Sequence, residues 1–403
     1  MLQLLLGGSG SGKTTLLYQR IRTRAEKGEK SILLVPEQFT SSTEGRIYRE
    51  LGDALSGMVE SFSFTSLAEK ILSTEGGAAV QTLSDAGRAV LVRRALEELQ
   101  DNVHYYHRHR RSAAFCQMAA QTIDELKSAG LSGRQLAQLA GACGAESGKL
   151  SELALIFQGY ETLLARSGMD PSDRLELAGA RLEEALARHS LPEFLRDRAV
   201  FIDEFDTFNA PKKRLLGAML AALPSVTVAL CDDGAPLLPG DLSLFSGAKQ
   251  VAAQLRQLAR KNGAQVAAPE LLRRDLRHND APGLAALTEL LETGSCTPPE
   301  SAPELRLFAA ASREEEARCA AAAIRRLMRQ GVRCGKIAVV CRDISLYRAA
   351  GRGYDRAADR AGQDRPVRPD RTGGLCAGKL RLHMVAQCSG VAGRIYQKSP
   401  GLR

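Results

Sequence analysis

The first fourteen residues constrain this chain more than any other stretch does. The apolar run Leu4–Leu6 leads into Gly7-Gly8-Ser9-Gly10-Ser11-Gly12-Lys13-Thr14, which matches G-x-x-x-x-G-K-[ST], the phosphate-binding loop between a buried strand and a helix. Glycines allow backbone N–H groups to turn inward around a polyphosphate, and the helix expected from about residue 14 to residue 25 points its positive N-terminal end at the same group. The pattern predicts a nucleoside triphosphate site, for ATP with Mg²⁺, that runs from Gly7 to Thr15.

An acidic pair is the expected partner of this loop. The run Ala199–Ile202 has the length and apolarity of a buried strand, and Asp203-Glu204 follow it directly. In phosphate-loop proteins the lysine, here Lys13, reaches the β- and γ-phosphates, while the loop hydroxyl and an aspartate hold Mg²⁺. We expect Thr14 and Asp203 to be the metal ligands and Glu204 to be a catalytic residue that activates the attacking water. A solvated acidic turn is the alternative interpretation.

Bulk properties exclude several protein classes. No stretch of about 18 apolar residues is present, so no transmembrane span is predicted. Nine scattered cysteines without a C-x-x-C pair argue against a metal knuckle or a disulfide framework, and for reduced thiols in the cytoplasm. The net charge is +9, but residues 349–403 hold nine Arg and two Lys against four Asp, so the rest of the chain is nearly neutral. Bulk charge is therefore no argument for DNA binding.

Strand-length and helical patterns alternate along the chain. Further strands are predicted at residues 31–35, 59–64 and 225–230. Between about residues 83 and 189, apolar residues recur every three or four positions on four stretches, which indicates helices with little strand. The loop Pro36–Thr40 follows a strand at the edge where open α/β sheets bind ligands. Gln38 is the candidate nucleotide contact there, and a plain connecting loop is the alternative.

The character of the chain changes twice in its last third. After Pro298, Pro299 and Pro303 a new α/β unit is predicted, with strands at 305–309 and 337–341 and a capping box at Ser312–Glu315 before a helix. From about residue 349, Gly, Arg, Ala and Asp dominate and all periodicity ends. A basic tail, a Gly/Arg-rich nucleic-acid segment and a frameshift are three interpretations of this segment, and we expect it to pack against nothing.

Together these patterns predict an α/β fold. It comprises a parallel sheet with the phosphate loop, an inserted all-helical subdomain and a truncated second α/β domain. The predicted parts are residues 1–78 (first part of the nucleotide-binding domain), 79–195 (helical insertion), 196–298 (remainder of that domain), 299–348 (start of the second α/β domain) and 349–403 (the Gly/Arg-rich tail).

Six segments carry a family resemblance, at residues 4–15, 33–40, 62–68, 83–88, 201–205 and 337–343. With them, the chain from residue 1 to about 348 resembles the N-terminal part of AddB (RexB-like), the B-type member of the bacterial AddAB helicase–nuclease. The segments V-P-E-Q-F-T and L-S-D-A-G-R are specific, whereas the phosphate loop is shared by many unrelated proteins.

The resemblance implies a superfamily 1 helicase-like (RecA-like) fold and ATP-linked processing of double-strand DNA ends for recombinational repair. It implies duplex ends and single-stranded DNA as partners, together with an AddA-like helicase–nuclease subunit in a heterodimer. The family's nuclease domain and its [4Fe-4S] cluster would lie beyond residue 403, so neither is expected in this chain.

Departures from the family pattern bear on hydrolysis. Only six residues precede Gly7, so we expect no glutamine motif that grips adenine, and many relatives have Asp-Gly where this chain has Asp203-Glu204. Arg342 is the single candidate for the catalytic arginine that a second domain would supply. We therefore expect ATP binding with little or no hydrolysis. The alternative function is a stand-alone nucleotide-binding regulatory ATPase or transferase that uses the helical segment as a lid.

Overall fold

The computed structural model describes residues 1–77, 81–109, 111–142, 144, 147–347, 393–394 and 396–397. The chain forms two compact units, Met1–Arg277 and His278–Arg403. Among the described helices, none combines the length and the apolar character needed to cross a membrane.

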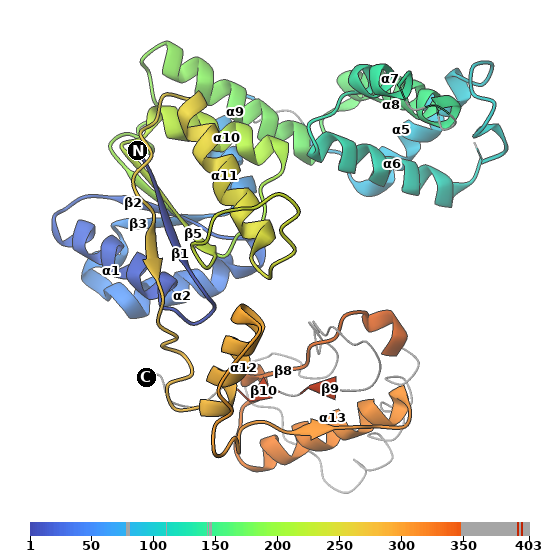
Figure 1. The fold of residues 1–403 in the computed structure, drawn as a ribbon. Coiled ribbons are helices and arrows are strands. Elements are labelled where there is room, and N and C mark those ends of the chain that lie inside the picture. The colour runs from blue at the N-terminus through green and yellow to red at the C-terminus, as the bar shows by residue number, and fades with distance from the viewer. Residues whose placement is uncertain are drawn as a thin grey trace, which may run out of the picture. The chain divides into compact units, whose positions relative to one another are not determined.

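A six-stranded, all-parallel sheet forms the centre of the first unit (Figure 1). Its order is β3-β2-β4-β5-β1-β6, and its strands are β1 (Leu2–Gly7), β2 (Ser31–Leu34), β3 (Val59–Phe62), β4 (Ala199–Ile202), β5 (Ser225–Cys231) and β6 (Glu270–Leu272). The first five strands lie where the sequence predicts them. β6 was not predicted, because it has only three residues and begins with a glutamate. All six carboxyl ends meet at one edge of the sheet, which brings the ends of β1 and β4 to the same side.

Alternation of side chains along each strand divides the core between the two faces of the sheet. One face packs against α1 (Lys13–Glu26) and α2 (Thr40–Leu51), which η1 (Glu37–Phe39) precedes and the short α3 (Asp53–Ser56) follows. The other face packs against α4 (Phe64–Glu75), α9 (Pro171–Ala187), α10 (Ala210–Ala222) and α11 (Ser246–Lys261). Both faces are covered, which explains why β2 and β4 read as continuous apolar runs.

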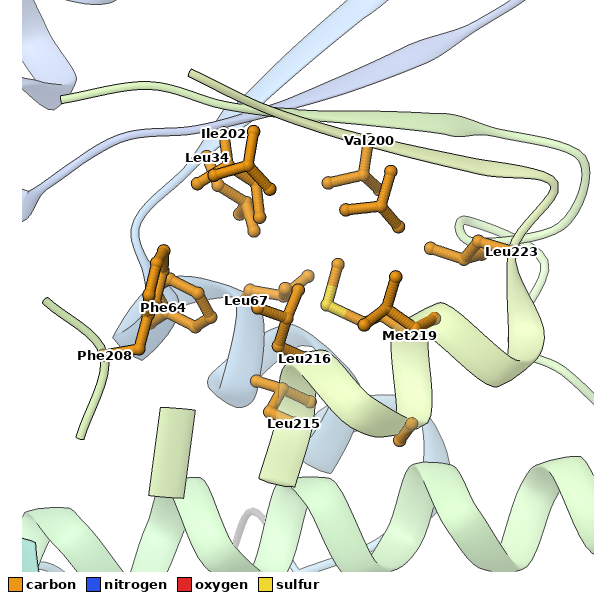
Figure 2. Packing of buried hydrophobic residues seen from close by; sticks show 14 of the residues in the cluster. Leu34, Phe64, Leu67, Val200, Ile202, Phe208, Leu215, Leu216, Met219 and Leu223 are labelled. Carbon is orange, nitrogen blue, oxygen red and sulfur yellow. The ribbon is translucent and has the colours of Figure 1, made fainter. Parts of the chain in front are cut away.

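The larger face shows how strands and helices share this core (Figure 2). Leu34, Val200 and Ile202 point from β2 and β4 toward Leu67 of α4 and Met219 of α10, and all five are fully buried. α10 begins at a side-chain cap, with Asn209 accepting a hydrogen bond from the Lys212 backbone N–H at 3.1 Å, and has a proline in its first turn. This core holds the strand that ends at Asp203 in a fixed register beside its neighbours.

Helices fill the chain between β3 and β4, as the periodicity predicts. α5 (Asp85–Glu98), α6 (Ala113–Ser128), α7 (Gly133–Ala140) and α8 (Ser147–Ser167), with η2 (His107–His109), surround a hydrophobic cluster of their own. A buried polar group ties them to α9: the Asp170 carboxylate, 1% exposed, accepts from Lys127 Nζ at 2.8 Å and from the Tyr160 hydroxyl at 2.7 Å. That this segment is an inserted subdomain stays a prediction.

The second unit has less regular structure. It contains α12 (Pro282–Thr293), β7 (Leu307–Phe308), α13 (Arg313–Arg329), η4 (Cys334–Lys336), β8 (Ile337–Ala338) and η5 (Ile344–Tyr347), and β7 and β8 pair antiparallel with β9 (Gly393–Arg394) and β10 (Tyr396–Gln397). The two strands predicted here are two residues long instead of five. α12 was not predicted.

The cap of α13 differs in one detail from the predicted capping box. Ser312 Oγ accepts from the Glu315 backbone N–H at 3.2 Å, as expected, but the Glu315 carboxylate accepts from Ala311 N–H at 3.0 Å and not from Ser312. The predicted tail is described only at β9 and β10, where it pairs with β7 and β8. The expectation that it packs against nothing is wrong there, because the backbone N–H and C=O groups of β7 and β8 offer edges that an added strand can satisfy. The rest of the tail lies outside the described residues.

Candidate nucleotide-binding site

The glycine turn between β1 and α1 has the backbone that its sequence requires. Gly10 and Gly12 adopt φ values of 84° and 90°, in the left-handed region where side chains other than hydrogen are strained. A Cβ on Gly7 would lie 2.4 Å from Ser11 Oγ and 2.7 Å from the Leu272 carbonyl oxygen, so only glycine fits there. Lys13 Nζ donates to the carbonyl oxygens of Gly7 and Gly8, each at 2.7 Å. The lysine is thus folded back over the turn that a phosphate would occupy.

The acidic pair lies at the same edge of the same sheet. β4 and β1 are separated only by β5, which places their ends about 10 Å apart. Asp203 is 6% exposed, and burial raises the pKa of its carboxyl group, while the Thr14 hydroxyl, the Glu204 backbone N–H at 3.0 Å and the charges of Arg46 and Lys13 oppose that rise. The structure therefore brings Lys13, Thr14 and Asp203 together, as the sequence predicts.

This donor set suits Mg²⁺ bound through a nucleotide. One hydroxyl and one carboxylate, completed by water and phosphate oxygens, are typical ligands for this ion. In the described part of the chain, no group of three or more His, Cys, Asp or Glu side chains could hold a metal by itself. A magnesium site here would thus depend on the phosphates for the rest of its ligands.

Glu204 has an unusual backbone. Its φ is 64°, in the left-handed region that costs a non-glycine residue about 1–3 kcal/mol. Burial, followed by the nearby charge of Asp203, raises the pKa of the Glu204 carboxyl group. Backbone strain and perturbed pKa values are both common at functional sites, and the role of Glu204 as a general base stays a prediction.

A cavity of about 190 Å³ opens beside the acidic pair, between α1, α2 and the ends of β2 and β4. Its lining includes Thr14, Tyr18, Arg46, Asp203 and Glu204. Tyr18 and Arg46 were not predicted, because neither belongs to a nucleotide-binding motif. The sequence contains one signal for Arg46, which is its spacing. Arg46 lies three positions after Thr43 and four after Ser42, so the three residues share one face of the helix that follows the loop 36–40.

The segment after β6 covers the other side of the glycine turn. The Leu276 backbone N–H donates to the Gly10 carbonyl oxygen at 3.0 Å, and Arg277 Nη1 donates to Ser9 Oγ at 3.3 Å. Arg277 is therefore a second basic group at the glycine turn, beside Lys13, and it was not predicted from the sequence. If β6 had been predicted, Arg277 could have been proposed as a site residue, because ligands bind at the carboxyl ends of strands.

Three further predicted residues are exposed. Thr15 and Gln38 are exposed, and the cavity lining includes the neighbour of Gln38, Phe39. Arg342 is exposed and belongs to the second unit. The roles of these three residues stay predictions.

Comparison with known proteins points to one family. Residues 4–288 match the sequence model of the family described as "ADDB, N-terminal". The chain is 34% identical over 363 residues to the B-type subunit of an ATP-dependent helicase/deoxyribonuclease from Desulforudis audaxviator, and this alignment covers 86% of the chain and 30% of that relative. Proteins of the same name from Symbiobacterium thermophilum and Moorella thermoacetica are each 32% identical, over 86% of this chain and 31% of their own length. The chain thus spans about 30% of the length of these curated relatives.

Proposed function

Since this chain belongs to the family of AddB amino-terminal regions, we propose that it is the nucleotide-binding part of a B-type subunit of an ATP-dependent helicase–deoxyribonuclease. In this proposal the complex processes duplex DNA ends for recombinational repair in the cytoplasm, and its other member is an A-type helicase–nuclease subunit. The alternative, a stand-alone regulatory ATPase or transferase, has no support among the relatives named above.

The observation that carries the proposal is the convergence of Lys13, Thr14 and Asp203. All three lie at the carboxyl edge of one parallel sheet, at the end of two strands separated by a single strand. Lys13 donates to two carbonyl oxygens of its own turn, and a bound triphosphate would exchange these for phosphate oxygens of greater charge. A RecA-like nucleotide domain with an inserted helical subdomain at residues 79–195 is the finer fold that we propose around this site.

Each residue of the site then has a defined role. The N–H groups of the glycine turn and of the first turn of α1 bind the phosphates, because they have no partner within the helix and lie at its positive end. Thr14 and Asp203 hold Mg²⁺, which neutralises charge on the phosphate oxygens when it is bound. Glu204 accepts the proton of an attacking water. In this proposal, hydrolysis of ATP by this chain alone is slow.

Nucleotide binding by the 403-residue chain tests the proposal directly. Titration calorimetry with Mg²⁺-ATP is expected to show one site, and Lys13→Ala is expected to weaken binding by about 100-fold or more because it removes charge-assisted hydrogen bonds to two phosphates. Lys27→Ala is the matched control, since Lys27 is an exposed lysine at the opposite end of the same helix. Equal affinities for Lys13→Ala and Lys27→Ala would contradict a nucleotide site at this turn.

Binding to a blunt DNA duplex, with and without the A-type subunit, tests the wider role. We expect end binding that depends on both the A-type subunit and ATP. Vigorous DNA-stimulated ATP hydrolysis by this chain alone, abolished in Lys13→Ala, would show that the expectation of slow hydrolysis is wrong.

A further inference from the structure

The cavity beside the acidic pair has the size of part of a nucleotide. At about 190 Å³ it is smaller than the roughly 300 Å³ at which pockets for whole small ligands begin. It lies next to Thr14, Asp203 and Glu204, the residues to which we assign the cation and the water. The space therefore suits a terminal phosphate with its hydrated cation, and not a base and ribose.

A cation from α2 enters this cavity. The Cζ atom of Arg46 lies 4.9 Å from the centroid of the Tyr18 ring, and Tyr18 is buried in the core beneath α1 and α2. Burial raises the pKa of Tyr18 to about 12, so the ring is uncharged at neutral pH and offers its face to the guanidinium. The ring thus holds the Arg46 guanidinium from one side, in the cavity that Asp203 and Glu204 also line.

The donors of Arg46 are available to a ligand. Over the residues that the structure describes, the Arg46 side chain makes no ion pair within 4.0 Å and no hydrogen bond, although it lines the same cavity as Asp203 and Glu204. An arginine that serves only to neutralise these carboxylates would be expected to pair with them directly. A planar fork of five donors beside a cation site is instead suited to phosphate oxygens.

We propose that Arg46, held against Tyr18, contacts the terminal phosphate of the bound nucleotide and makes the site select triphosphate over diphosphate. This inference rests on the proposed function, because it assumes that ATP binds at the glycine turn. In this inference, the arginine at the terminal phosphate comes from the first unit of the chain itself. From the sequence, Arg342 was the single candidate for that role. Arg46 thereby becomes the specificity-determining residue of the site.

Separate affinities for Mg²⁺-ATP and Mg²⁺-ADP test the inference. We expect Arg46→Ala to weaken ATP binding by about 10- to 100-fold, as for loss of a hydrogen bond to a charged group, while ADP affinity changes by less than about twofold. Arg46→Lys, which keeps the charge but loses the fork, should recover part of the selectivity. Arg94→Ala removes an exposed arginine from α5 and is expected to leave both affinities unchanged.

Substitutions of the ring provide a second readout that leaves Arg46 in place. Tyr18→Phe keeps the aromatic face and should preserve the ratio of ATP to ADP affinity, whereas Tyr18→Leu should lower it. Circular dichroism of each variant establishes that it is folded, and the conservative variants Arg46→Lys and Tyr18→Phe carry the test if Arg46→Ala or Tyr18→Leu does not fold.

The outcomes separate this inference from the proposed function. If the wild-type chain binds neither nucleotide, the proposed function itself is wrong. If the wild-type chain binds ATP and Arg46→Ala weakens ATP and ADP equally, or weakens neither, only the role of Arg46 is overturned.

Discussion

Replacing Gly10 by alanine should reveal how closely the segment 275–277 packs on the glycine turn. Gly10 has a φ of 84°, so an alanine there costs about 1–2 kcal/mol in backbone strain alone. Its Cβ would also lie 2.7 Å from Asp275 Oδ1 and 2.8 Å from Arg277 Cβ. Neither neighbour moves freely, because Asp275 Oδ1 accepts from the Arg277 backbone N–H at 3.0 Å and Arg277 Cβ is fixed to the backbone. Such overpacking adds about 1–3 kcal/mol, for a total of about 2–5 kcal/mol.

Gly28→Ala is the matched control for this substitution. Gly28 has nearly the same φ, 77°, but a Cβ added there would meet nothing within 4 Å. It should therefore lose only the roughly 1–2 kcal/mol of backbone strain. The effect of alanine on the unfolded chain is common to both variants and cancels in their difference.

Urea denaturation followed by far-ultraviolet circular dichroism measures both variants. We expect the free energy of unfolding of Gly10→Ala to lie about 1–3 kcal/mol below that of Gly28→Ala. Equal losses would refute the reasoning, because they would mean that Asp275 and Arg277 do not lie against the turn. Calorimetry on the same samples should show weaker ATP binding for Gly10→Ala alone, since only that substitution displaces the segment that carries Arg277.

Two further substitutions test the strain at the site and the support beneath it. Glu204→Gly relieves the strain of the left-handed backbone at φ 64°, whereas Glu204→Ala loses the same carboxylate but keeps a Cβ. The glycine variant should therefore be about 1 kcal/mol more stable than the alanine variant, and equal stabilities in urea would argue against strain at this position. Among the described residues, Lys127→Ala leaves the buried Asp170 carboxylate with only the Tyr160 hydroxyl as a side-chain partner, and it should lower the free energy of unfolding by about 3 kcal/mol. The matched substitution Arg94→Ala, in an exposed ion pair, should cost about 0.5 kcal/mol or less. Burial disfavours the charged Lys127, yet Asp173 and Asp170 outweigh it and raise the pKa of the lysine above 10.5. The stabilisation by Lys127 should accordingly be complete below pH 10.5 and decline as the pH rises through the higher pKa of the folded chain, and a wild-type advantage that instead grows with rising pH would contradict this assignment.

Local patterns were sufficient for much of the fold. The buried strands β1, β2, β4 and β5 are runs of apolar residues whose length and composition need no knowledge of the rest of the chain. The glycine turn is equally local, since glycine adopts the left-handed conformation of Gly10 and Gly12 without strain whatever surrounds it. The caps of α10 and α13 could be predicted for the same reason, because each depends on a side chain and a backbone N–H three residues later.

Other features depended on neighbours that are remote in sequence. β6 has three residues and one glutamate, and it is a strand only because β1 offers an unpaired edge beside it. The strands predicted at 305–309 and 337–341 are reduced to two residues each, because a strand extends only as far as its partner does. An apolar run of strand length thus favours a strand, but the strand partner decides whether and how far the strand forms.

The sequence by itself was sufficient to propose which residues bear the chemistry, Lys13, Thr14 and the pair Asp203-Glu204, because motifs are patterns of neighbouring residue types. Only the tertiary structure decided what stands around them: Arg46 and Tyr18 on one side and Arg277 on the other. These residues come from three segments whose meeting depends on the order of the strands and on the faces that their helices bury. Strand order results from the packing of the whole sheet, and no local stretch of this chain contains that information.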